Sequence, residues 1–309
     1  MSNEATEVEE LLDRAYESED EAEIAELVNR ALEIEPDNPE ALLLRADMTD
    51  DDEERLSILT GAVDAVRTVL NGMDKPDEDL ENVYMALTQR LAFTLFSVGD
   101  DEAALPLAEE LISRDIDDGG TSKSLYYRIL IERQEWARIL DETRDDTDHQ
   151  LGWAYARMAA LFMTGDRKAA ASMFWDALIM APNVPFYMLG YMPEPGSDGQ
   201  DVLVSASAQG GARLTQTDGE DDEDFNFACL YEDVWSLSRD MLNWFSRGVI
   251  LFGLLSGRLN SDRDSMLEIL DSLGGRAEYE KMSGIIRDSD DETIIETLAA
   301  HRCLVDSVD

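Results

Sequence analysis

The chain has 309 residues, an apolar fraction of 44% and a formal net charge of −44 at pH 7. This density of negative charge repels a phosphate backbone and so excludes nucleic acid as an expected partner. The apolar fraction is sufficient for a core, and the length suits a stack of helix pairs better than one compact core.

The N-terminal third predicts three pairs of amphipathic helices, in which apolar residues recur at three- and four-residue intervals. The first pair spans residues 8–36. The second begins at Pro39, which is tolerated in the first turn of a helix, and ends with a partner helix at about residues 54–70. The third pair starts near Asp79. Pro106 lies inside its second helix, where proline costs about 3 kcal/mol, so we expect this helix to begin late or to bend.

Residues 122–142 predict a fourth, shorter pair whose turn lacks glycine, and residues 151–184 give the clearest pattern in the chain. In 151–184, apolar side chains gather on one face of each of two short helices. Gly165 lies where the chain reverses and can adopt positive φ, while Asp166 can cap the second helix and Pro182 ends it. Such a hairpin leaves an apolar side uncovered, which predicts similar hairpins stacked against it.

This segment resembles one tetratricopeptide repeat, a helix-turn-helix unit of about 34 residues. The match covers the family's small, aromatic and proline positions, at Gly165, Ala170, Phe174, Ala177 and Pro182. The third pair has the same register, because Gly99 and Ala104 are five residues apart, as Gly165 and Ala170 are. The resemblance implies an all-α fold, a right-handed solenoid of four or five stacked helix pairs, which binds rather than reacts.

Residues 179–245 resemble the suppressor-of-tumorigenicity type of tetratricopeptide protein, a resemblance that implies no known activity. The first half of the match is a proline-bounded segment made by Asn183, Val184, Pro185, Tyr187, Leu189 and Gly190. The second half is a helix carrying Phe227, Ala228, Tyr231, Trp235 and Trp244. Between them lies an insertion at about residues 193–224, rich in Gly, Ser and Asp, which predicts a loop in which a short hairpin around Gly210 is one alternative.

The C-terminal part predicts helices that cap the solenoid. Residues 224–258 predict one long apolar helix, or two joined near Gly248, packed across the end of the last pair. Three further helices are expected at residues 264–273, 277–287 and 292–305, and the last is expected to turn Ile294, Ile295, Leu298 and Leu304 inward. The predicted organisation is a TPR-like helix-pair array at 1–190, a loop at 191–224 and a C-terminal helical segment at 225–309.

Motifs for catalysis or metal binding are not found. No glycine-rich phosphate loop follows a predicted strand, and no nucleophile elbow is present. His149 and His301 lie in different segments without zinc-ligand spacing, and the acidic runs 218–224 and 288–292 lack the EF-hand pattern. The sequence therefore predicts no catalytic residue, metal or cofactor.

The predicted binding surface is the concave side of the array, which the first helix of each pair lines. Alignment of the pairs places eight side chains there: Gln89, Phe93, Phe96, Ser124, Arg128, Tyr155, Ala159 and Phe162. An aromatic groove with one arginine suits an extended or helical peptide. Two other interpretations stay open, because these aromatic residues can belong to the core and the C-terminal helices can fill the groove.

Charge and cysteine usage suggest where the protein works. Only four lysines accompany 69 acidic residues, which is typical of a salt-accumulating cytoplasm or an acidic proteome, although part of the charge can attract a basic partner. The two cysteines, Cys229 and Cys303, lie in apolar helical surroundings and predict buried, reduced thiols. The N-terminus has no signal-peptide pattern, and the apolar run at 249–255 is far shorter than the ~20 residues that span a bilayer.

The leading hypothesis is a cytoplasmic scaffold or adaptor that binds a peptide or protein segment in a concave helical groove. The alternative is an enzyme or enzyme subunit with a site between the solenoid and the C-terminal helices. A third hypothesis is a homo-oligomer formed through the apolar stretch at 235–252.

Overall fold

The computed structural model describes residues 3–18, 20–75, 77–114, 120–144, 150–195, 220–286 and 289–305. Within these residues, every regular element is a helix. They form sixteen α-helices and two short 3₁₀ helices, so the expected all-α class is confirmed. None of these helices combines the length and the apolar character needed to cross a lipid bilayer. The chain divides into two compact units, Met1–Asp117 (unit 1) and Asp118–Asp309 (unit 2). This division falls between the third and the fourth expected helix pair.

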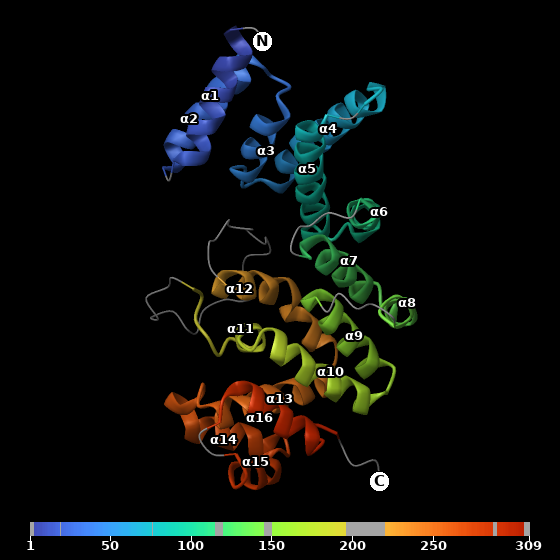
Figure 1. The fold of residues 1–309 in the computed structure, drawn as a ribbon, viewed down its shortest axis with the longest axis vertical. Coiled ribbons are helices and arrows are strands. Elements are labelled where there is room, and N and C mark those ends of the chain that lie inside the picture. The colour runs from blue at the N-terminus through green and yellow to red at the C-terminus, as the bar shows by residue number, and fades with distance from the viewer. Residues whose placement is uncertain are drawn as a thin grey trace. The chain divides into compact units, whose positions relative to one another are not determined.

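Unit 1 contains the first three helix pairs in chain order (Figure 1). Its helices are α1 (Asn3–Glu17), α2 (Glu21–Ile34), α3 (Pro39–Asp47), α4 (Asp52–Gly72), α5 (Glu78–Ser97) and α6 (Asp101–Ser113). Within the pairs, α1 packs on α2, α3 on α4 and α5 on α6. Between the pairs, α2 contacts α3, and α5 contacts both α3 and α4. Each hairpin of this unit therefore covers the apolar side of its neighbour in sequence.

The short helix α3 joins the two core clusters of unit 1. Ala41, at its start, is buried among side chains of α1 and α2, such as Leu12 and Val28. Ala46, one turn and a half later, belongs to a second cluster with side chains of α4 and α5, such as Leu59. Full burial of one such leucine contributes about 1.5–3 kcal/mol, so these clusters stabilise the stacking of the pairs.

Acidic and amide side chains start the later helices of unit 1. Helices α2 to α6 each have an N-cap side chain that accepts a hydrogen bond from a backbone N–H of the first turn, from Asp20, Asn38, Asp51, Asp77 and Asp100. A cap of this kind stabilises a helix by about 1 kcal/mol. Because Asp100 caps α6 through the N–H of Ala103, this helix starts at Asp101 and continues through Pro106. Of the two alternatives expected at Pro106, the late start is wrong, and the bend stays a prediction.

Unit 2 begins with two further helix pairs, α7 (Thr121–Glu132) with α8 (Trp136–Glu142), and α9 (Leu151–Met163) with α10 (Arg167–Met180). Helix α9 packs on α10, α8 and α7. The two first helices, α7 and α9, approach closely because Gly152 has no side chain: a Cβ there would lie 2.7 Å from the Cα of Ser124. The short helix α11 (Val184–Met188) follows α10.

The turns after α5, α7 and α9 share one geometry, which also ends α14 (Arg263–Ser272) at Gly274. Gly99, Gln134 and Gly165 all have positive φ, of 82°, 56° and 94°. In each turn, the N–H of this residue donates to the carbonyl three residues earlier, and the next N–H donates to the carbonyl five residues earlier. This is the hydrogen-bond pattern that closes a helix at a left-handed residue. The turn without glycine at residues 132–136 thus has the same geometry as the two glycine turns.

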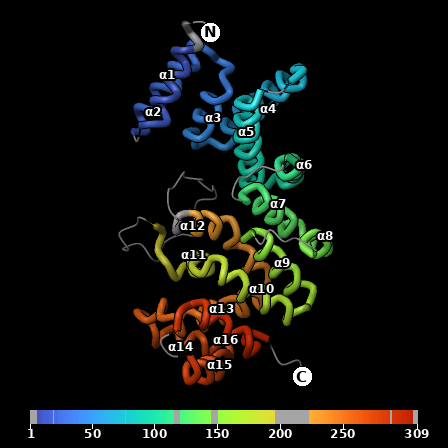
Figure 2. Tube along the Cα trace, viewed as in Figure 1, coloured from blue at the N-terminus to red at the C-terminus, as the bar shows by residue number. Residues whose placement is uncertain are grey.

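The rest of unit 2 consists of helices that pack on the second pair and on one another (Figure 2). They are α12 (Glu220–Tyr231), the 3₁₀ helix η1 (Glu232–Leu237), α13 (Arg239–Ser256), the 3₁₀ helix η2 (Asn260–Asp262), α14 (Arg263–Ser272), α15 (Arg276–Ser283) and α16 (Asp291–Ala300). The side chains of Ile294, Ile295, Leu298 and Leu304 are buried, as expected. Cys303 is also buried, but Cys229 is exposed, so the expectation of two buried thiols is wrong for Cys229.

The long apolar stretch after the insertion breaks at Ser238 and not at Gly248. Ser238 has an extended backbone, and its hydroxyl oxygen accepts a hydrogen bond from the N–H of Met241, which starts α13. Gly248 lies inside α13, where a Cβ would be 2.7 Å from the ring of Phe174. The glycine therefore serves the packing of α13 on α10. Most of the expected insertion, including the alternative hairpin, lies outside the described residues, as does His149, and α12 already begins at Glu220.

Candidate functional site

The predicted groove residues of unit 2 lie on one surface, which we call the α7–α9 face and define by Ser124, Arg128, Tyr155 and Phe162. Ser124 and Arg128 are four residues apart on α7, so they share one side of that helix. Tyr155 and Phe162 share one side of α9 at a spacing of seven. The close contact at Gly152 brings these two helices together and makes one continuous surface of both sides.

Helix α12 lies on this face and is held there by two hydrogen bonds to main-chain oxygens. The guanidinium Nε of Arg128 donates to the carbonyl of Leu230 at 3.0 Å, and its Nη1 donates to the carboxylate of Glu132 at 2.8 Å. The hydroxyl of Tyr231 donates to the carbonyl of Ser124 at 2.8 Å. Arg128 is only 6% exposed, so its charge needs partners within the protein. Glu132 and the carbonyl at the C-terminus of α12 provide them.

An aromatic cluster fills the space between α9 and the covering helices. The ring of Tyr155 has edge contacts with Phe227, Tyr231 and Trp235, at centroid distances of 5.3, 6.2 and 5.8 Å. Phe227 stacks on Tyr231 at 4.5 Å, and Trp235 stacks on Phe245 of α13 at 3.9 Å. Burial raises the pKa of the phenols of Tyr155 and Tyr231 well above the usual value, so both stay neutral hydrogen-bonding groups.

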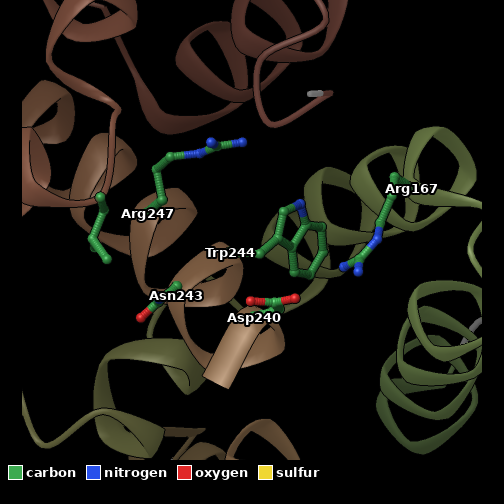
Figure 3. A pocket seen from close by; sticks show the side chains of 6 residues that line it. Arg167, Asp240, Asn243, Trp244 and Arg247 are labelled. Carbon is green, nitrogen blue, oxygen red and sulfur yellow. The ribbon is translucent and has the colours of Figure 1, made fainter. Parts of the chain in front are cut away.

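Phe162, at the other end of the face, lies beside a small pocket. Its ring contacts Trp244 of α13 at 5.0 Å, and the guanidinium of Arg167 lies over its other side, 3.2 Å from the ring centroid. The pocket has a volume of about 200 Å³ and is lined by Arg167, Asp240, Asn243, Trp244, Arg247 and Leu273. Arg167 extends from α10 and the next four from α13, with the two arginines on either side of the Trp244 ring (Figure 3).

Half of the six side chains that line the pocket are charged, those of Arg167, Asp240 and Arg247. Its volume is below the range of about 300–1,000 Å³ that is typical of ligand pockets, so it suits one side chain or a small anion. The Trp244 indole donates to the carbonyl of Leu304 at 3.2 Å, which fixes one wall. Guanidinium groups bind carboxylates well, but no cysteine, serine or histidine side chain lines this space. The arrangement can hold a charged group.

Ala159 is buried on α9, and the other three predicted residues lie on α5 of unit 1. Phe93 is buried at 8% exposure, while Gln89 and Phe96 are half-buried. The structure therefore brings Arg128, Tyr155 and Phe162 to one face in unit 2, and Gln89, Phe93 and Phe96 to one helix in unit 1. Whether any of them touches a partner stays a prediction.

The residues that cover the α7–α9 face follow a pattern that is visible in the sequence, although they were not among the predicted groove residues. Phe227, Tyr231 and Trp235 recur every four residues, a spacing that places aromatic rings on one side of a helix. The structure directs these rings at Tyr155. Both open interpretations describe this part of unit 2, because Tyr155 and Phe162 are buried and residues of α12 and η1 cover Tyr155. Comparison with protein-family models, curated proteins and solved structures finds no match to this chain.

Proposed function

We propose that this protein is an interaction scaffold, built from helix pairs of the tetratricopeptide type, that binds a segment of a partner protein on the faces of its first helices. The antiparallel packing of α5 on α6, α7 on α8 and α9 on α10 supports a repeated unit. The contacts α3–α5 and α7–α9, each between first helices within one unit, support side-by-side stacking of neighbouring pairs.

One observation carries the proposal: the α7–α9 face already holds a helix. Arg128 donates a hydrogen bond to a main-chain carbonyl of α12, and a tyrosine hydroxyl of α12 donates one to a main-chain carbonyl of α7. The ring of Tyr155 makes edge contacts with aromatic rings of α12. These are the interactions with which helical grooves recognise peptides in other chains. The corresponding surface in unit 1, with Gln89, Phe93 and Phe96 on α5, is the proposed site for a partner.

The charge of the chain indicates the kind of partner. A net charge of −44 accelerates the approach of a basic segment and repels an acidic one. We therefore propose a basic peptide or protein segment as the partner and the cytoplasm as the setting. The alternative of a homo-oligomer places a second copy of this acidic chain against the first, which the same charge disfavours at low salt.

Site-specific photo-crosslinking in the native host tests the scaffold. A photoreactive phenylalanine at Phe96 is expected to form a covalent adduct with a partner protein. The same residue at Val69, which is 49% exposed on α4, is the matched control and is expected to form none. Equal adducts at both positions, or no adduct at Phe96 in a folded chain, would contradict a binding surface on α5.

The position of the pocket favours a second candidate function, an enzyme or enzyme subunit. The pocket lies between α10 and the C-terminal helices α13 and α14, where the alternative hypothesis places a site. Phosphate or a small dicarboxylate should then raise the melting temperature of the wild type but not of an Arg167→Gln variant. Equal melting curves with and without the anions would remove this candidate.

A further inference from the structure

We propose that unit 1 is a salt-dependent folding unit, which is folded at high ionic strength and opens before unit 2 when the ionic strength falls. The proposal goes beyond the scaffold function and does not depend on it. It rests on three observations: the chain divides into two compact units, the charge is divided unequally between them, and their cores differ in composition.

The negative charge of the chain is concentrated in unit 1. Residues 1–117 include 34 acidic and 8 basic residues, a net charge of −26. Residues 118–309 include 35 acidic and 17 basic residues, a net charge of −18. The electrostatic energy of a charged body grows with the square of its net charge and falls with its radius. At equal screening, self-repulsion in the smaller unit 1 is therefore roughly two to three times that in unit 2.

Ion pairs on the surface of unit 1 offset only a small part of this repulsion. Within the described residues of the unit, six arginines pair with carboxylates: Arg14, Arg45, Arg55, Arg67, Arg90 and Arg114. Their side chains are 24–57% exposed, and ion pairs at such exposed positions contribute little to stability. Eight basic residues also cannot balance 34 acidic ones. The excess of carboxylates in unit 1 is therefore compensated mainly by dissolved cations.

The core that opposes the repulsion is weaker in unit 1. Among the twelve largest fully buried side chains of the described residues, unit 1 provides Tyr84 and three leucines, whereas unit 2 provides seven aromatic rings and Leu125. Each aromatic side chain buries about 150–250 Å², and hydrophobic stabilisation scales with the apolar area removed from water. Unit 1 thus combines the stronger repulsion with the smaller stabilisation from its core.

Ionic strength determines how far the repulsion acts. A compact segment of 117 residues has a radius of gyration of about 13 Å. The screening length is about 30 Å at 0.01 M salt and about 3 Å at 1 M. At low salt, each carboxylate of unit 1 therefore repels all the others in the unit, whereas at 1 M only close neighbours interact.

Unit 1 can open without unit 2, because its two core clusters consist only of its own residues. The surface of α5 that carries Gln89, Phe93 and Phe96 lies in this unit. Ionic strength therefore also controls that surface.

Hydrogen exchange of the full-length chain at low and high potassium chloride concentration, both at pH 7, tests this proposal. When the salt is lowered, amides of α4 and α5 are expected to lose about tenfold more protection than those of α9 and α13. Unit 2 is the internal reference for any effect of salt on the chemistry of exchange. Uncharged sucrose at the osmolality of the high-salt sample is the control and should not restore the difference. An equal loss in the two units, or a larger loss in unit 2, would overturn the proposal.

Two matched pairs of charge reversals test whether charge within unit 1 is the cause. Asp13→Lys with Glu33→Lys changes two exposed positions on α1 and α2, and brings the net charge of unit 1 from −26 to −22. Because repulsion scales with the square of the charge, the tenfold difference is expected to fall to about fivefold. Glu268→Lys with Glu296→Lys changes two exposed positions on α14 and α16 of unit 2, and should leave the difference at about tenfold or above. The same reduction by both pairs would overturn the proposal, because repulsion across the whole chain would then set the loss of protection.

Discussion

Gln134 shows how strongly the turn geometry of the helix pairs is imposed on single residues. It has a φ of 56°, at the turn position that Gly99 and Gly165 occupy in two other pairs. A side chain in the left-handed region costs about 1–2 kcal/mol, whereas glycine adopts it without a steric penalty. The hydrogen bonds of the turn, from the N–H groups of Gln134 and Glu135, are nevertheless formed. Packing of α7 against α8 and α9 therefore sets this backbone conformation.

Gln134→Gly is expected to stabilise the protein by about 0.5–1 kcal/mol, because relief of the strain exceeds the entropy that glycine adds to the unfolded chain. Urea denaturation measures the change. Gly165→Ala, which places a Cβ at a φ of 94°, should act in the opposite direction. A Gln134→Gly protein less stable than the wild type would show that the turn is not strained.

Glu232 links stability to pH at the junction of α12 and η1. Burial, aided by the neighbouring charge of Asp233, raises the pKa of its carboxyl group from 4.5 to about 7. The folded state therefore binds this proton more tightly than the unfolded state does. The contribution of Glu232 to stability is fully present below pH 4.5 and is lost as the pH rises to about 7.

Replacement of Glu232 by Gln removes this titration. The difference in the free energy of unfolding, variant minus wild type, is expected to increase between pH 4.5 and pH 7 and to stay constant above that range. Urea denaturation at several pH values checks this, and use of the difference cancels the other carboxylates of the chain. A difference that does not change with pH would mean that the Glu232 carboxyl is fully solvated.

At the scale of elements, the contact between α7 and α9 determines whether the α7–α9 face exists as one surface. Gly152 permits this contact, since a Cβ would lie 2.7 Å from the Cα of Ser124 and 2.6 Å from its Oγ. The carbonyl of the same Ser124 accepts the hydrogen bond from Tyr231. The distance between the two first helices and the position of α12 are therefore coupled through one residue.

Gly152→Ala should destabilise the protein by about 1–3 kcal/mol, because backbone atoms of α7 cannot give way without moving the helix. The matched control is Gly61→Ala in α4, where a Cβ meets no atom within 4 Å. That variant should gain up to about 1 kcal/mol from the higher helix propensity of alanine. Thermal and urea unfolding of both variants provide the comparison. Equal gains would mean that α7 and α9 are further apart than described.

The sequence predicted these elements to different extents. Helix pairs and turns were accessible because apolar periodicity and cap residues act within a few positions, as at Gly165 and Asp166. The sides of α7 and α9 also followed from periodicity. The covering of that face did not, because the bond from Arg128 to Leu230 joins residues 102 positions apart. The break at Ser238 was missed because serine caps a helix only in an extended backbone conformation, which the sequence alone does not specify.

At the scale of the whole molecule, negative charge is the dominant property. The chain carries 69 acidic residues against 25 basic ones. Arginines form specific ion pairs within each unit, such as the one from Arg258 to Asp291 at 2.7 Å, but the excess of carboxylates remains. Mutual repulsion of these charges opposes the compact state, and dissolved salt screens it.

Stability should therefore rise with salt. The urea midpoint is expected to increase between 0.1 M and 1 M potassium chloride, since the screening length falls from about 10 Å to about 3 Å. Uncharged sucrose at the same osmolality is the control for effects that do not depend on charge. A midpoint that is constant or falls with salt would contradict a folded state limited by carboxylate repulsion.

A double-mutant cycle between Tyr155 and Phe227 measures whether α12 is held on the α7–α9 face. Tyr155→Leu and Phe227→Leu, alone and together, are expected to give a coupling free energy of about 0.5–1.5 kcal/mol for their edge contact. The matched cycle pairs Tyr155 with Phe225, whose ring contacts Tyr187 on α11 instead, and should give less than about 0.5 kcal/mol. Coupling that is absent, or equal in the two cycles, would mean that α12 does not pack on Tyr155.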